Sequence, residues 1–236
     1  MGAFLTVPRG RPSSMALRRV GIPKKAYPRT SVGERMTRPA VVALIPESTR
    51  KRKGGDEGPA DEVLDALPEP ARGDLLRLRE EVAARSPHGM LETEGLMPAY
   101  RRFDGNMYRR IPPQAWEARR PEVEVLIVSG LLGLVASRDA VPAYAHSMAE
   151  PCPPFGKLNR WWHGAGLAGI LRAYIEAVRP TTVIDLLSHE YREAVAGFAD
   201  GLRGTDVRTV DFPGLGRGSQ PLRGERIADL LRIGRV

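Results

Sequence analysis

The sequence predicts an α/β fold, a single domain with a central mixed, partly parallel sheet flanked by helices. Two runs of β-branched and aliphatic residues, at 125–128 and 182–186, have the composition of strands covered on both faces. Residues 71–84 carry apolar side chains at i, i+3 and i+7, the spacing of an amphipathic helix. Because strands alternate with helices along the chain, we expect a layered architecture with part of the sheet parallel.

The first half of the domain is expected to begin with a strand. The apolar run at 41–45 predicts this strand, and the charged, glycine-rich residues after it predict a loop. A helix expected at 114–119 ends before Pro121, since proline cannot continue a helix. The other elements expected here are a loop at 50–61, a helical turn at 62–67, a loop at 86–95 and a short helix or turn within 96–108.

The second half is expected to contain the longest helix, at 157–178. Three glycines, Gly164, Gly166 and Gly169, weaken the first half of that helix. The chain then alternates again, with a strand at 182–186, a helix at 188–201, a strand at 207–212 and a terminal helix at 225–233.

The segment 125–148 joins a buried strand to a glycine-rich turn on which a site can be built. Ser129 and Gly130 end the strand, and Gly133 follows three residues later. Glycine is needed where the backbone has a positive φ or approaches another group closely. Arg138 adds a charge beside the turn and Tyr144 an aromatic hydroxyl. The alternative is a strand, a tight turn and a plain connecting loop.

The basic composition describes the N-terminus rather than the domain. The net charge is +8, but the first 35 residues hold eight basic residues and one acid, which leaves +1 for the remainder. Residues 1–38 are rich in proline, glycine and serine and lack periodicity, so we expect a disordered basic tail. Three interpretations of the tail stay open: a nucleic-acid arm, a targeting segment, or an extension upstream of a start at Met36.

Composition also limits the compartment and the cofactors. The single cysteine, Cys152, cannot form an internal disulfide, so we expect a reduced cytoplasmic compartment. No apolar stretch approaches the roughly 20 residues of a membrane helix, so we expect no membrane association. The histidines lack metal-ligand spacing and no nucleotide-binding glycine motif follows a strand, so we expect neither a metal nor another cofactor. Nothing implies a stable protein partner.

Polar residues follow three of the predicted strands, at the point where each strand ends. The residues are Ser48 and Lys51 after the first strand, Ser129 and Gly130 after the second, and Asp185 and Ser188 after the third. Since ligands bind outside the carboxyl ends of strands in open α/β sheets, parallel strands would gather these side chains at one rim. The alternative is that each serine caps a helix or turn.

Two basic segments favour contact with phosphates. The run 50–53 is a cationic loop beside two glycines, and paired arginines at 101–102 and 109–110 flank the aromatic residues Tyr100, Phe103 and Tyr108. Basic residues interleaved with aromatics can follow a nucleic-acid backbone and stack bases. The alternative is that the aromatics belong to the core and the arginines are solvated.

Four short sequence segments, taken in their order along the chain, resemble segments of the YaaA family, the bacterial peroxide stress proteins. The matching positions are Pro46, Ser48, Lys51, Gly54, Gly55 and Asp56; Phe103, Gly105 and Tyr108; Ser129, Leu132, Gly133, Arg138, Pro142, Tyr144, Ser147 and Met148; and Asp185, Leu186, Ser188 and Tyr191. Glu47, Thr49 and Arg50 depart from the family pattern. The family's closing basic element is represented by Arg223 and Gly224, with its preceding lysine replaced.

The resemblance implies a YaaA-like α/β domain over 39–236 and a role in surviving hydrogen peroxide, through limiting free iron and oxidative DNA damage. It also implies a positively charged cleft, a helix-hairpin-helix-like element and weak, phosphate-led DNA binding. Together with the rim, it assigns ligand or DNA binding to Ser48, Lys51, Arg102, Gly105, Tyr108, Ser129, Gly130, Arg138, Tyr144, Asp185, Ser188, Tyr191 and Arg223. No catalytic residue is assigned. The alternatives are an enzyme acting on a nucleobase or nucleoside at the rim, and a degenerate member that only binds.

Removing residues 1–35 should leave the melting temperature unchanged, because their composition cannot bury enough apolar surface to offset the chain entropy lost on ordering. Thermal unfolding of the full chain and of the chain that begins at Met36 checks this. A fall of several degrees would show that the tail belongs to the fold.

Overall fold

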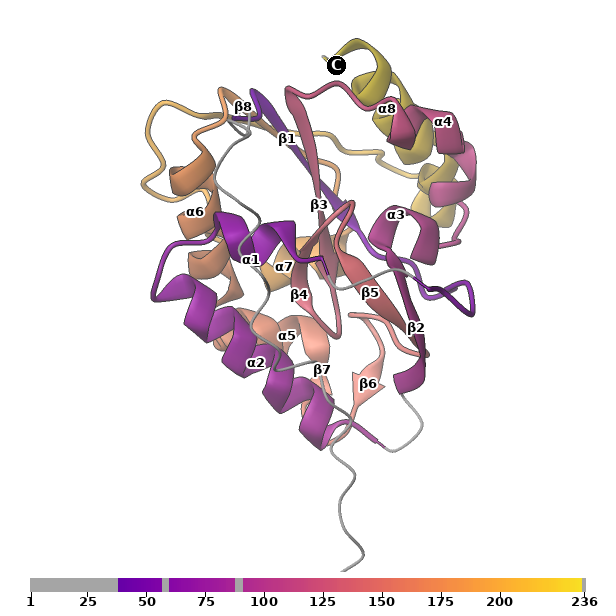
Figure 1. Cartoon of the computed structure of the whole chain (residues 1–236). Helices are drawn as coiled ribbons and strands as arrows, with labels where there is room; N and C mark the ends of the chain where they lie inside the picture. Colours follow the sequence, from indigo (N-terminus) through magenta and orange to yellow (C-terminus); the bar gives the residue numbers. More distant parts are fainter. Residues whose placement is uncertain (1–37, 57–59, 88–90, 235–236) are drawn as a thin grey trace, which may run out of the picture.

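A five-stranded sheet organises the protein in the computed structural model, which describes residues 38–56, 60–87 and 91–234. Apart from Arg38, the tail expected at 1–38 lies outside these residues. The strands lie in the order β4-β3-β1-β8-β9 (Figure 1). Their bounds are β1 Val41–Pro46, β3 Val123–Ser129, β4 Gly133–Ala136, β8 Thr182–Asp185 and β9 Asp206–Thr209.

The central strands are parallel, so their carboxyl ends meet at one edge of the sheet. Val41 of β1 lies between Val123 of β3 and Thr182 of β8, and the register continues from there without a break. β9 extends the parallel set beyond β8, whereas β4 folds back antiparallel on β3. This confirms the predicted α/β class with a mixed, partly parallel sheet.

The order of the strands places a topological switch point between β1 and β8. The chain leaves β1 toward β3, on one side, and leaves β8 toward β9, on the other. The segments that follow β1 and β8 therefore turn away from each other. This leaves a crevice at the carboxyl ends of these two neighbouring strands. Residues just after Pro46 and Asp185 therefore occupy the place where α/β proteins most often bind ligands.

Two small sheets supplement the central one. β2 Leu91–Pro98 pairs antiparallel with β5 Ala140–Tyr144, and β6 Pro151–Cys152 pairs with β7 Gly156–Lys157. The prediction of a loop at 86–95 was therefore wrong from Leu91 onward, where the chain forms β2. Its sequence has no apolar run, and the strand depends on pairing with β5, in a register that shifts between Glu92 and Met97.

Helices lie on both sides of the sheet, with α1, α2 and α6 packed together on one side and α4 against α8 on the other (Figure 1). The α-helices are α1 Glu62–Ala66, α2 Ala71–Arg85, α3 Ala99–Arg102, α4 Pro113–Glu117, α5 Leu158–Gly164, α6 Leu167–Val178, α7 His189–Ala194 and α8 Ser219–Ile233. Two 3₁₀-helices are η1 Tyr108–Arg110 and η2 Gly216–Gly218. None of the helices in the described part of the chain is both long and apolar enough to span a bilayer.

Three predicted helices differ from the observed ones. The helix expected at 157–178 is two helices, because Gly166 has φ +93° and ends α5 before α6 begins. The helix expected at 188–201 ends at Ala194 and continues as turns, with Gly197 at φ +83°. The terminal helix begins at Ser219 rather than 225, so Arg223 lies inside it.

A buried arginine protects the edge of the sheet formed by β4. Arg79 on α2 donates from Nε to the carbonyl oxygen of Leu132 at 2.9 Å and from Nη2 to that of Leu134 at 2.6 Å. Its third nitrogen pairs with Asp61 beside α1. Arg79 is only 5% exposed, so these carbonyl oxygens are shielded from water. The guanidinium supplies the donors that the N–H groups of a neighbouring strand would otherwise provide.

Replacing Arg79 with alanine should lower the free energy of unfolding by about 3–5 kcal/mol, because it leaves a carboxylate and two carbonyls without their buried partner. Arg77→Ala is the matched control on the same helix, since Arg77 is exposed and its one ion pair within the described part of the chain is with Asp74. Its loss should lower the free energy of unfolding by no more than about 0.5 kcal/mol. Urea unfolding checks both variants. Equal, small losses would show that the β4 edge does not depend on Arg79.

Candidate functional site

A buried carboxylate lies at the carboxyl end of β1. Glu47 directly follows Pro46, and its side chain is 0% exposed. Oε1 accepts a hydrogen bond from the backbone N–H of Gly130 at 2.8 Å, and Oε2 accepts one from the hydroxyl of Tyr144. The hydroxyl of Tyr191, on α7, lies 3.5 Å from Oε1. One carboxylate thus joins the ends of β1, β3 and β5 to α7.

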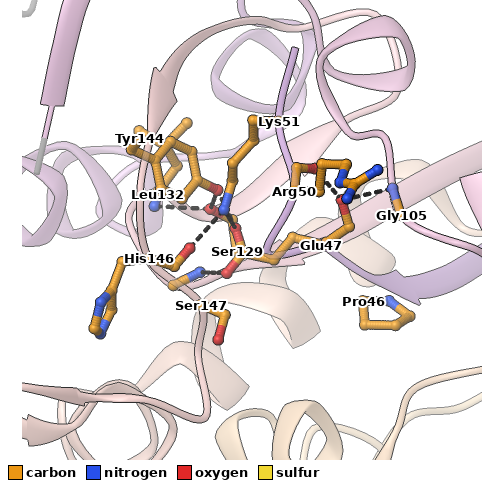
Figure 2. Close-up of polar contacts among 12 residues, drawn as sticks. Pro46, Glu47, Arg50, Lys51, Gly105, Ser129, Leu132, Tyr144, His146 and Ser147 are labelled. Atoms are coloured by element: carbon orange, nitrogen blue, oxygen red, sulfur yellow. Dashed lines mark hydrogen bonds and ion pairs between the residues drawn. The ribbon is translucent and has the colours of Figure 1, made fainter. Parts of the chain in front are cut away.

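The positive partner of Glu47 is Lys51, four residues later. Its Nζ lies 3.5 Å from Glu47 Oε2 and donates to the carbonyl oxygen of His146 at 2.5 Å (Figure 2). It also lies 3.8 Å from the centre of the Tyr144 ring. The side chain is only 3% exposed, and this burial lowers the pKa of Lys51, against the opposite effect of Glu47.

Hydroxyl groups complete the cluster. Ser129 Oγ lies 2.7 Å from the hydroxyl of Tyr144 and accepts the N–H of Leu132 at 3.1 Å. Tyr108 donates to the carbonyl oxygen of Pro46 at 2.9 Å. Burial, with a further contribution from Glu47, raises the pKa of Tyr108, Tyr144 and Tyr191 well above its usual range. These hydroxyls therefore stay protonated and act as hydrogen-bond donors. We call Glu47, Lys51, Tyr144, Ser129 and Tyr191 the Glu47 cluster.

Two glycines are required by close approaches around the cluster. A Cβ on Gly130 would lie 3.0 Å from both Glu47 Oε1 and the backbone nitrogen of Met148. A Cβ on Gly105 would lie 2.7 Å from the Cβ of Ser48. Ser48 Oγ accepts the N–H groups of Asp104 and Gly105, each at 3.1 Å, so it holds the loop after β1 against the segment before η1.

A second group of the predicted residues lies at the end of β8. Asp185 accepts the N–H of Leu187 at 2.8 Å and pairs with Arg192 at 2.6 Å. Arg223 on α8 is 7% exposed and donates to the carbonyl oxygen of Leu186 at 3.0 Å. Ser188 precedes α7, the helix that carries Tyr191 to the Glu47 cluster. The two groups therefore adjoin through α7.

The remaining two predicted residues lie elsewhere. Arg102 is 0% exposed and donates to the carbonyl oxygens of Val141, Arg52, Gly54 and Gly95. Arg138 is exposed in the turn between β4 and β5, at the opposite end of β3 from Ser129. Arg102 thus fastens the loop after β1 from inside, and Arg138 is apart from both groups.

Exposed cations gather outside the Glu47 cluster. Residues 50–53 run beside residues 102–104, since Lys51 and Phe103 form an antiparallel bridge. The carboxylate of Asp104 lies 3.4 Å from Arg52 and 2.7 Å from Arg109, and these arginines hold its pKa below the usual range, Arg109 most strongly. Residues 102–104 lead to η1, whose two arginines are exposed. We call the exposed basic residues of 50–53 and of η1 the cationic surface: Arg50, Arg52, Lys53, Arg109 and Arg110.

Sequence reasoning missed Glu47, the centre of the cluster, because it departs from the family pattern. Two signals pointed to it: it follows a wholly apolar strand, and it stands four residues before Lys51. Cys152 is buried, and burial raises the pKa of its thiol, so it is a poor nucleophile. Among the described residues, no three His, Cys, Asp or Glu side chains are grouped to hold a metal ion.

Comparisons with known proteins agree on one family. A family model described as peroxide stress protein YaaA matches residues 57–220. A UPF0246 protein of Streptomyces coelicolor is 29% identical over 201 residues, 75% of this chain and 72% of the relative. A UPF0246 protein of Ruegeria sp. is 31% identical over 98 residues, 39% of each chain. The matched range contains Gly105, Ser129 and Tyr144, whereas Glu47 and Lys51 precede it.

Raising the pH above about 10 should destabilise the fold steeply. Tyrosines of the unfolded chain ionise near pH 10, whereas burial raises the pKa of Tyr108, Tyr144, Tyr174 and Tyr191 in the folded chain. Stability that is fully present below pH 10 is therefore lost above it, by up to about 1.4 kcal/mol per tyrosine per pH unit. The lowered pKa of Lys51 acts in the opposite sense, but one lysine is outweighed by four tyrosines.

The urea midpoint measured against pH checks this, with tyrosinate absorbance recorded in the same samples. Tyr108→Phe should make the dependence shallower, because it removes one of the titrating groups. If the midpoint stays constant while tyrosinate forms in the folded protein, the hydroxyls are not held as described.

Proposed function

This chain belongs to the YaaA family of peroxide stress proteins, and we propose that it acts in the peroxide response by binding DNA weakly, through contacts with the phosphates of the DNA backbone. The observation that supports this proposal is the cationic surface. Five exposed arginine and lysine side chains lie on two adjoining segments, and Asp104 is the one carboxylate that ion-pairs with them among the described residues. Basic groups collected in this way neutralise phosphates without reading bases.

Residues 50–53 are fixed to residues 102–104, and the N–H of Arg109 donates to the carbonyl oxygen of Gly105 at 3.0 Å, so the charges of the cationic surface keep a defined spacing. The N–H of Arg52 donates to the carbonyl oxygen of Arg102 at 2.8 Å, and that of Asp104 donates to Arg50 at 3.0 Å. The buried Arg102 also fixes the loop after β1, because its guanidinium donates to the carbonyl oxygens of Arg52 and Gly54. A surface held in this way loses little conformational entropy on binding, which favours contact with a regular phosphate backbone.

Exposed cations rather than buried ones carry the proposed contacts. Lys51, Arg102 and Arg223 were expected to meet phosphates, but the side chain of Lys51 is 3% exposed, Arg102 is 0% exposed and Arg223 is 7% exposed. All three donate to main-chain carbonyls. The exposed neighbours Arg50, Arg52 and Arg109 take this role in the proposal. With so few charges, affinity falls in the non-specific range, on the order of micromolar or weaker at physiological salt.

An enzyme acting on a nucleobase or nucleoside is the second candidate, favoured by the Glu47 cluster at the carboxyl ends of parallel strands. It is the weaker candidate, because both oxygens of Glu47 already accept hydrogen bonds from the protein itself. Salt distinguishes the two: phosphate-led binding weakens steeply with salt, and a small-molecule site does not.

Replacing Arg50 or Lys53 with alanine should weaken DNA binding equally for all sequences and flatten the slope of log affinity against log salt by about one unit each. Fluorescence anisotropy with two duplexes of unrelated sequence checks this, in the full chain and in the chain that begins at Met36. The second chain is needed because the basic tail can bind nucleic acid by charge alone. Loss of all binding on removing residues 1–35 would exclude the cationic surface.

Asp104→Asn should strengthen DNA binding and steepen the salt dependence by about one to two units, because it releases Arg52 and Arg109 from their shared carboxylate. Asp74→Asn is the matched control: it makes the same change in net charge on α2, where Asp74 pairs with Arg77. If both variants bind alike, only net charge matters and Asp104 does not compete with phosphate.

A further inference from the structure

The outer side of α8 carries apolar side chains that stay open to solvent. Leu222 is 38% exposed and Ile233 is 48% exposed, and among the described residues the one other exposed large apolar side chain is Leu215, just before this helix. The inner side of α8 is closed, since Ile227 and Leu230 are fully buried in the core. Figure 1 shows α8 at the periphery of the molecule, beside α4. Single exposed leucines are common on protein surfaces, so the pattern in which these residues stand decides what they mean.

Two of these apolar residues belong to a stripe with the spacing of a coiled coil. Steps of four, three and four residues along α8 place on one side of the helix Leu222, Arg226, Asp229 and Ile233. Arg226 is exposed, and the side chain of Asp229 is 49% exposed. We call these four residues the α8 stripe. It has an apolar residue at each end and two opposite charges in the middle.

The α8 stripe is complementary to itself when one copy is reversed. In an antiparallel pair of α8 helices, Leu222 lies opposite Ile233 of the second copy, and Arg226 lies opposite Asp229 of the second copy. A twofold axis repeats both contacts, so each copy gives and receives the same ones. In a parallel pair, by contrast, Arg226 would face Arg226 and Asp229 would face Asp229. The charges in the middle of the stripe therefore fix the orientation of the two helices as well as their register.

Two charged residues beside the stripe add to this complementarity. Glu225 and Arg232 are exposed, and they flank the stripe at the positions that meet across an antiparallel pair of helices. Glu225 therefore faces Arg232 of the second copy, and the twofold axis repeats this pair. Competing pairs within the chain are weak. Asp229 lies 2.7 Å from Arg232 in an exposed pair, which contributes little to stability, and Arg226 makes no ion pair with another described residue.

We propose that the α8 stripe binds the α8 stripe of a second copy of this chain, in an antiparallel contact with twofold symmetry. A second copy supplies the complementary group at every position, whereas an acidic or a basic partner would match only one of the two central charges. The contact is short, because α8 has 15 residues and only its outer side takes part. It buries less than the roughly 1,200 Å² of a stable interface, so the dimer is weak and forms at high protein concentration. This proposal does not rest on DNA binding.

Sedimentation velocity of the full chain, without DNA and over a wide range of concentrations, tests the contact. The chain should pass from monomer to dimer as its concentration rises. Ile233→Ser should raise the dissociation constant about tenfold, because the dimer loses an apolar contact from each copy. Leu215→Ser is the matched control: Leu215 is as exposed as Ile233 but lies outside the stripe, so this variant should dimerise like the unaltered chain.

Reversing the charges distinguishes the proposed contact from unspecific association. Arg226→Asp and Asp229→Arg should each stay monomeric at concentrations where the unaltered chain dimerises, because like charges then face each other. An equimolar mixture of the two variants should dimerise again, since each variant meets opposite charges at both positions of the other. Both side chains face solvent, so circular dichroism should show that the variants keep the fold.

Disulfide trapping tests the orientation of the two helices. Leu222→Cys and Ile233→Cys should give no covalent dimer when each variant is oxidised alone, whereas a mixture of the two should cross-link. Cys152 is buried, so it should stay out of the reaction. Three results would each overturn the proposal: a chain that is monomeric at every concentration, a dimer that none of the stripe variants weakens, or cysteine variants that cross-link to themselves.

Discussion

A buried carboxylate is the constraint around which this structure is arranged. Removing the charge of Glu47 from water costs several kcal/mol unless nearly every lone pair is matched by a donor. The donors come from four separate segments: the N–H of Gly130, the hydroxyls of Tyr144 and Tyr191, and the ammonium of Lys51. Each segment must therefore reach its place before the charge is tolerated. Partial formation of this arrangement leaves an unpaired buried charge, so the ends of the parallel strands are held together as one unit.

Much of the sheet could be predicted, because apolar runs identify buried strands directly. The strands β1, β3 and β8 were found in this way, and their parallel order placed Ser48 and Ser129 at one edge. β2 was not found, since it is held by pairing with β5 rather than by its own composition. The break at Gly166 was also missed, because a helical pattern continues on both sides of it.

The sequence named Lys51, Ser129, Tyr144 and Tyr191, which the structure brings together, but it indicated neither Glu47 between them nor the burial of the group. Lys51 stands in a charged, glycine-rich sequence that usually forms a solvated loop, and Arg102 belongs to a pair of arginines between aromatic residues. Only the tertiary structure turns both side chains inward. Glu47 was unpredictable from a family pattern, since that pattern differs at this position. Successive side chains of an extended segment point to opposite faces, and this explains why Lys51 is buried. Along 50–53, Lys51 points inward beside Phe103, while its neighbours Arg50 and Arg52 face solvent. One short loop thus serves both the interior and the surface.

The two edges of the sheet are closed by different means. On β4, the guanidinium of Arg79 occupies the carbonyls that an incoming strand would use. On β9, the strand is four residues long and presents Asp206 and Arg208 to solvent. Short, charged edges resist pairing with another molecule. The chain belongs to a family of peroxide stress proteins, and oxidation of methionine to its sulfoxide disrupts protein cores, which leaves chains with exposed strands. A sheet whose edges offer such chains no template should stay out of the aggregates that they form.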